Sequence, residues 1–212
     1  MSATRADGAP RRVAIYADES CLGNGREGDN PGGAGALLEC HADDGSLVRR
    51  DLWVGAPGTT NNRMALQSVI ASFSALHAQG GCGRVTFTSD SRYLIDGMSD
   101  WVHGWSRRGW RRAAGPIENL ALWGAAIAAV QGSEVEWRWV RGHDGHAQNE
   151  YVNDLAVRGA RDQSASDGWI ASGFDAWLAA RSLSRSKVAP PEAFPAAFKA
   201  ARALPAPPSG RP

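Results

Sequence analysis

Alternating hydrophobic and polar positions mark the first elements of the chain. Around residues 13–17, apolar side chains alternate with others in the two-residue period of a half-buried strand. Two more strands are predicted at 32–39 and 47–54, because the Asp-Asp-Gly sequence at 43–45 is typical of a turn between them. We therefore expect the chain to open with three antiparallel strands.

The period then becomes helical. Polar residues at 59–62 offer helix caps, and an apolar stripe at helical spacing follows them. Its members are Leu66, Val69, Ile70, Phe73 and Leu76. After this helix, a short β-branched and aromatic run at 84–89 predicts a fourth strand.

Helices and one strand complete the predicted core. Helices are expected near 91–101 and 117–130, a last strand over 135–139, and a closing helix over 148–160. Strands that are joined through helices lie parallel in one sheet. The whole pattern predicts an α/β fold with a mixed five-stranded sheet flanked by helices.

Both ends differ from this core. Residues 1–11 form a short polar arm before the predicted domain at 12–162. From 163 to 187 we expect an extension with one short helix near 173–181. Seven of the eleven prolines lie in 188–212, and proline removes backbone donors, so this tail is expected to be disordered.

Composition narrows the classes of function. The chain is 43% hydrophobic and 21% charged, which suits a packed domain, and its net charge of +1 means that any nucleic-acid surface must be local. Cys21, Cys40 and Cys82 lack metal-ligand spacing. No export signal and no membrane-spanning run is apparent, so we expect reduced thiols, a cytoplasmic protein and no membrane partner.

Four polar segments stand in a specific order. They are 16–24 (YADESCLGN), 60–64 (TNNRM), 88–91 (TSDS) and 142–156 (GHDGHAQNEYVNDLA). Together they resemble the type I ribonuclease H family, and the likeness spans about residues 12–162. One such segment would be weak support, whereas four in order on the expected elements are strong.

The resemblance implies a ribonuclease H-like fold and an endonuclease that hydrolyses the RNA strand of RNA–DNA hybrids. It implies Mg²⁺ or Mn²⁺ as cofactor, with two ions, because paired cations serve both ends of a phosphodiester displacement. Asp18, Asp90 and Asp154 are expected to hold the metal, and His143 is expected to assist proton transfer. His146 is expected to be structural.

The chain departs from the family pattern at Ala65, where members have a glutamate directly after Arg-Met. Three explanations stand open: three aspartates suffice together with a substrate phosphate, another carboxylate substitutes, or the protein binds hybrids without cutting them. Glu19 is the first candidate surrogate, since the family has glycine there. Strand alternation points Glu19 away from Asp18 unless a bulge re-aims it. Glu27 and Asp29 also lie near the end of the first strand.

Substrate contacts are predicted at two places. Asn24, Asn61 and Asn62 suit 2′-hydroxyls and minor-groove edges, and Arg92, where the family has glutamine, suits a phosphate. A basic stretch resembles the protrusion that grips the DNA strand in some members. Its residues are Trp105, Arg107, Arg108, Trp110, Arg111 and Arg112.

Two other functions compete with the monomeric hybrid nuclease. The first is a non-catalytic hybrid-binding module, which Ala65 suggests. The second is a DNA-processing member of the same fold, such as a transposase or integrase core. The basic stretch and the paired asparagines argue against the second, because both suit a hybrid.

Overall fold

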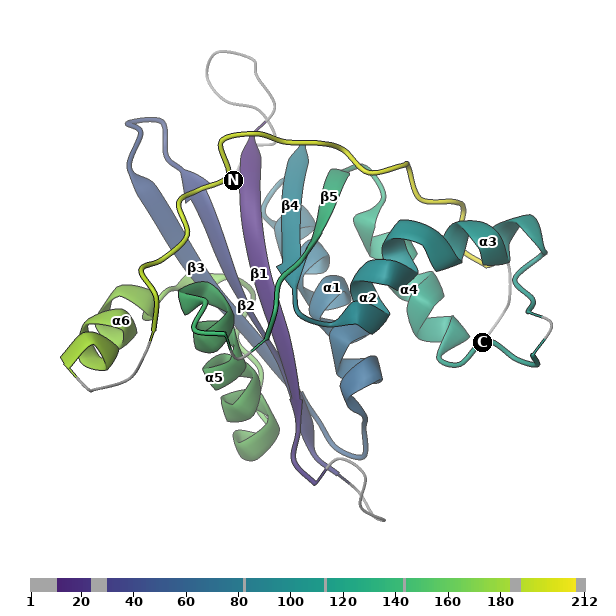
Figure 1. Cartoon of the computed structure of the whole chain (residues 1–212), viewed down its shortest axis with the longest axis horizontal. Coiled ribbons are helices and arrows are strands. Elements are labelled where there is room, and N and C mark those ends of the chain that lie inside the picture. The colour runs from purple at the N-terminus through teal and green to yellow at the C-terminus, as the bar shows by residue number, and fades with distance from the viewer. Residues whose placement is uncertain are drawn as a thin grey trace.

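A mixed sheet runs through the middle of the molecule (Figure 1). The computed structural model describes residues 11–23, 30–81, 83–112, 114–142, 144–183 and 188–208. The strands are β1 (Arg12–Cys21), β2 (Gly32–His41), β3 (Leu47–Ala56), β4 (Arg84–Ser89), β5 (Glu134–Trp139) and β6 (Ile170–Ala171). They lie in the order β5-β4-β1-β2-β3-β6.

The strand pairing confirms the predicted α/β sheet and adds one strand to it. β1, β2 and β3 pair antiparallel, and β4 and β5 continue the sheet parallel to β1. The sixth strand, β6, pairs antiparallel with β3. With two residues it is too short to show a period in the sequence.

Helices cover both faces of the sheet, with α1 and α4 on one and α5 on the other (Figure 1). Their bounds are α1 (Asn61–Ala78), α2 (Arg92–Asp96), the π-helical turn η1 (Gly97–Trp101), α3 (Val102–Arg107), α4 (Leu120–Val130), α5 (Ala147–Asp162) and α6 (Phe174–Leu183). Within the described ranges, no helix has the length and apolar character needed to cross a bilayer.

The alternation along β1 divides the interior into two cores. Val13 and Ile15 pack with α1 and α4, whereas Ala14 and Tyr16 pack with α5. The backbone of α5 lies directly on β2, since a Cβ added to Gly33 would lie 2.2 Å from the carbonyl oxygen of Ala156. This close approach fixes α5 beside the end of β1.

The C-terminal segment differs from the disorder that we expected. Residues 188–208, hereafter the tail, lie extended along the domain past the start of β1 and on toward α4 (Figure 1). The Arg12 guanidinium donates to the carbonyls of residues 195, 196 and 197 at 2.8–3.1 Å. Leu204 packs on the main core. Proline has no backbone N–H but keeps its carbonyl oxygen. The carbonyl oxygens of the tail therefore accept hydrogen bonds from side chains of the domain.

Three other predictions concern the N-terminal arm, the short helix after the domain and the cysteines. The predicted arm, apart from Arg11, lies outside the described residues, as do 184–187 and 209–212. The predicted short helix near 173–181 is confirmed as α6. Cys21 is a free thiol, Cys40 is buried, and Cys82 is outside the described residues.

Candidate active site

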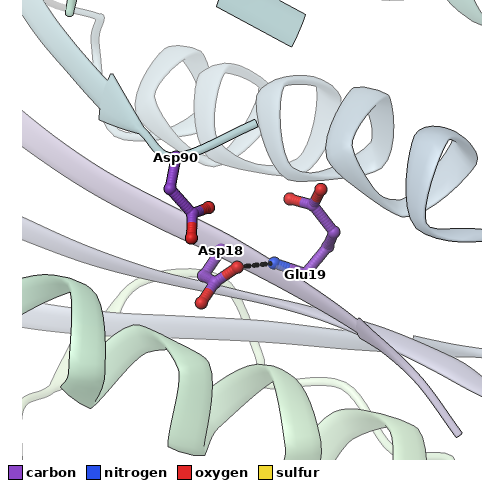
Figure 2. A group of neighbouring side chains, drawn as sticks. All are labelled: Asp18, Glu19 and Asp90. Atoms are coloured by element: carbon purple, nitrogen blue, oxygen red, sulfur yellow. Dashed lines mark hydrogen bonds between the residues drawn. The ribbon is translucent and has the colours of Figure 1, made fainter. Parts of the chain in front are cut away.

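Three carboxylates meet where β1 continues past the end of β4 (Figure 2). Asp18, Glu19 and Asp90 each offer one oxygen, and these oxygens lie within 4.8 Å of one another. Pairing between β1 and β4 stops at Ala17 opposite Ser89. The next two residues of β1 therefore have no β4 residue beside them, and Asp90 follows β4 at this place.

Glu19 joins the group without the bulge that we expected it to need. The pairing with β2 is regular, with Asp18 opposite Gly35 and Glu19 opposite Ala34. As alternation predicts, the side chain of Asp18 points toward α5 and that of Glu19 toward α1 (Figure 2). Both carboxylates nevertheless reach Asp90, because the edge of β1 is open there and Glu19 has one more methylene.

The group is electrostatically unfavourable without a cation. Burial, and then the neighbouring Asp90 carboxylate, raise the pKa of Asp18 to about 8. Burial, followed by Asp18 and Asp90, raises the pKa of Glu19 well above its ordinary value. The backbone N–H of Glu19 donates to Asp18 Oδ1 at 2.7 Å, but Glu19 Oε2 is buried and has no hydrogen-bond partner among the described residues.

Position 65 contributes no carboxylate and is buried. Ala65 is completely buried in the main core on α1. Ser68, whose hydroxyl donates to the Ala65 carbonyl at 2.7 Å, and Ser72 are also buried. The side of α1 that carries Ala65 is therefore packed inside the protein and not open to solvent.

Asp154 does not join the other two predicted aspartates. Its carboxylate accepts a hydrogen bond from Trp177 Nε1 at 2.8 Å and pairs with Arg181 at 2.9 Å. Both partners belong to α6, so Asp154 ties α5 to α6. Asp154 therefore lies on the flank of α5 that contacts α6, outside the group of Asp18, Glu19 and Asp90.

Sequence reasoning missed a residue of α5 whose charge reaches the site. Glu150 is near enough for its charge to raise the pKa of Asp18. Asn153 lies three residues further along the helix, on the same face as Glu150. Helical spacing from Glu150 does not choose between Asn153 and Asp154, which lie three and four residues on; the contacts of Asp154 with α6 do.

The loop before α5 closes against the same group. A Cβ added to Gly142 would lie 2.1 Å from Asp90 Oδ2, so this backbone abuts the carboxylate, and a larger residue here would require the Asp90 side chain to shift. His143, the predicted proton-transfer residue, follows Gly142 in the sequence but lies outside the described residues. Asn24, Glu27 and Asp29 also lie outside them.

Arg92 and the asparagines of α1 lie on neighbouring elements. The Arg92 guanidinium lies over the Trp139 ring at 3.7 Å, and Trp139 Nε1 donates to the Asp90 carbonyl at 3.0 Å. Arg92 is thereby held beside the acidic group. Asn61 and Asn62 open α1, and Asn61 Oδ1 is buried without a partner among the described residues.

The predicted basic protrusion separates into aromatic and cationic parts. Trp105 and Trp110 are half-buried against the main core, and Trp105 contacts Trp123 with ring centroids 5.5 Å apart. The cations are exposed and form no ion pair within the described part of the chain: Arg107, Arg108, Arg111 and Arg112. The tryptophans thus pack against the core beneath this stretch, and the arginines form its exposed surface.

Known proteins place this site in a family. The RNase H family model matches residues 10–161. The chain is 41% identical to the ribonuclease H of Rhodospirillum rubrum over 164 residues, 76% of this chain and 92% of that protein. It is 45% identical to the ribonuclease H of Herminiimonas arsenicoxydans over 150 residues, 70% and 94% of the two chains.

Solved structures of ribonucleases H have a similar fold. LC9-RNase H1, a type 1 RNase H with the type 2 active-site motif, is 57% identical with a TM-score of 0.85, covering 95% of this chain and 97% of that one. LC11-RNase H1, solved in complex with RNA/DNA hybrid, shares the fold at 14% identity, with a TM-score of 0.51 over 71% of this chain and 97% of that one. This chain belongs to the ribonuclease H family.

Proposed function

We propose that this protein hydrolyses the RNA strand of RNA–DNA hybrids at Asp18, Glu19 and Asp90, with Asn153 as a neutral fourth group. The convergence of the three carboxylates within 4.8 Å carries the proposal, because it supplies from β1 the carboxylate that Ala65 lacks. LC9-RNase H1 combines the type 1 enzyme with the type 2 active-site motif. A departure in the active-site residues is therefore compatible with a type 1 fold.

The acidic group fits divalent cations, which ribonucleases H use. Buried carboxylates with raised pKa values and an oxygen without a partner are the donor set that a hard cation requires. Asp18, Glu19 and Asp90 would hold the metal, which we propose to be two ions of Mg²⁺ or Mn²⁺. Bound there, the ions supply a water of lowered pKa and offset the charge that develops on the phosphate.

The surrounding residues orient the group and handle protons. The Glu19 N–H donates to Asp18 Oδ1 and so fixes the orientation of that carboxylate. Asn153 has the shape of an aspartate without its charge, which limits repulsion beside Glu150. His143, in the loop between β5 and α5, is proposed to move a proton at the attacking water or the leaving oxygen.

Substrate binding is assigned to the flanking surfaces. The four exposed arginines at and after the end of α3 are proposed to contact phosphates of the DNA strand. Arg92, which lies on the Trp139 ring, is proposed to contact a phosphate near the site. Asn24, Asn61 and Asn62 are proposed to contact 2′-hydroxyls. A monomeric state and a cytoplasmic location stay predictions.

A non-catalytic binding module is disfavoured by the same geometry. Buried like charges oppose folding, and a protein that only bound hybrids would not need three of them together. The test is a cleavage assay on matched hybrid, duplex RNA and duplex DNA across Mg²⁺ and Mn²⁺ concentrations. Cleavage of the RNA strand of the hybrid alone is expected, and binding without cleavage under every condition would favour the module.

A further inference from the structure

The tail is fastened to the loop that leads into α5. Gln148 Nε2 donates to the Glu192 carbonyl at 2.8 Å, and the Glu192 N–H donates back to Gln148 Oε1 at 3.1 Å. Three residues earlier, the Ala189 N–H donates to the Gly145 carbonyl at 2.8 Å. Tail residues 189–192 therefore hold both sides of the loop–helix junction.

The Glu192 side chain adds a more specific contact. Its carboxylate lies 3.1 Å from His146 Nε2 and 3.4 Å from the Arg138 guanidinium. His146 is the N-cap of α5, and its Nδ1 accepts from the Asn149 N–H at 3.3 Å. A neutral imidazole has one acceptor and one donor nitrogen, so the bond to Glu192 suits the ring orientation that caps the helix.

The first turns of α5 form one wall of the active site. Glu150 acts on Asp18, Asn153 shares its face, and Gly142 abuts Asp90 at the other end of the loop. In the sequence, His143 precedes His146 by three residues. A contact that fixes His146 thus fixes the start of the helix that faces the metal-binding carboxylates.

We propose that Glu192 is a positioning residue for the hydrolysis: through His146 it holds the N-terminus of α5, and so Glu150 and Asn153, against Asp18. The tail is then a part of the working enzyme and not an appendage. This inference rests on the proposed active site. No atom of Glu192 needs to touch substrate or metal.

The experiment compares Glu192→Ala and Glu192→Gln in the full chain with a matched control, Arg12→Gln. Arg12 holds the tail at residues 195–197, away from the loop, so its loss loosens the tail without altering the contact to His146. For each variant kcat, KM for a hybrid, the half-saturating Mg²⁺ concentration and the melting temperature are measured. His146→Asn, alone and with Glu192→Ala, completes a double-mutant cycle, since asparagine caps a helix without needing a partner.

Glu192→Ala should lower kcat about tenfold and raise the half-saturating Mg²⁺ concentration, as loss of an outer partner commonly does at a metal site, while KM changes less than kcat. Glu192→Gln should retain most activity, because its amide oxygen still accepts from His146. In the His146→Asn background, Glu192→Ala should have no further effect. Arg12→Gln should lower the melting temperature and leave kcat unchanged.

Two results would overturn the proposal. One is a loss of kcat in Glu192→Ala that persists undiminished in the His146→Asn background. The other is a loss in Arg12→Gln as large as that in Glu192→Ala, which would make the tail a general stabilising element. Failure of the active-site assignment would show separately, as undiminished cleavage in Asp18→Asn and Glu19→Gln.

Discussion

Neutralising Asp18 should make the metal-free protein more stable while abolishing cleavage. At pH 7 a carboxyl with a pKa of about 8 keeps its proton in the folded protein, whereas in the unfolded chain, with a pKa of 3.8, it has lost it. Folding Asp18 into the site then costs up to ~4 kcal/mol, at about 1.4 kcal/mol per tenfold difference. Relaxation of the structure around Asp18 reduces this cost. We therefore expect Asp18→Asn to increase the free energy of unfolding by about 2 kcal/mol, or the melting temperature by ~4–8 °C.

The sign of the pH dependence follows from the same values. Between pH 3.8 and about 8 the folded protein binds more protons at Asp18 than the unfolded chain, so stability of the metal-free protein falls as pH rises. The advantage of Asp18→Asn should thus be absent below about pH 4 and full above about pH 8. Asparagine can still accept the Glu19 N–H, so the geometry is kept.

Urea unfolding in EDTA at several pH values, repeated with Mg²⁺, measures this gain. Mg²⁺ should narrow the difference, because the ion stabilises the wild-type site more than the variant. Asp154→Asn is the matched control: it removes a carboxylate that is paired with Arg181, so no gain is expected. An Asp18→Asn variant no more stable than wild type in EDTA at pH 8, or a gain independent of pH, would refute the reasoning.

Three further predictions concern other parts of the molecule. Ala65→Glu should destabilise the protein by about 3 kcal/mol in urea unfolding, because position 65 lies in the buried core. The variant should not lower the Mg²⁺ requirement for cleavage, and a lowered requirement would contradict this prediction. Replacing Arg107, Arg108, Arg111 and Arg112 with alanine should reduce the slope of log affinity against log salt by up to ~3.6, and an unchanged slope would exclude phosphate contacts. Truncation after residue 187 should lower the melting temperature by ~4–8 °C because Leu204 leaves the core and Arg12 loses its acceptors; an unchanged melting temperature would mean that the tail does not pack.

Local periodicity was sufficient for the fold but not for the site. The two-residue and helical periods predicted the five longer strands and the main helices, because each period reports which side of an element is buried. Glu19 shows the limit of that information. Whether it meets Asp18 depends on where β4 stops beside β1, and this register is set by tertiary pairing.

The other differences have similar causes. Choosing between Asn153 and Asp154 is a shift of one residue, which turns a side chain by about 100° around the helix and from one flank of α5 to the other. The tail follows no period, and its acceptor groups meet Arg12, more than 180 positions away in the chain. The family resemblance located the segments correctly, whereas the contacts of individual side chains required the structure.

The central claim is that Glu19, and not Asp154, completes the carboxylate group. Its most direct test is the rate of RNA-strand cleavage in a hybrid by Glu19→Gln and by Asp154→Asn, each titrated with Mg²⁺ and Mn²⁺. We expect Glu19→Gln to lose at least about 100-fold in kcat, as for loss of a group that holds charge in the transition state, with hybrid affinity retained. Asp154→Asn should keep kcat within a few-fold of wild type. Near-normal cleavage by Glu19→Gln together with an inactive Asp154→Asn would contradict the account.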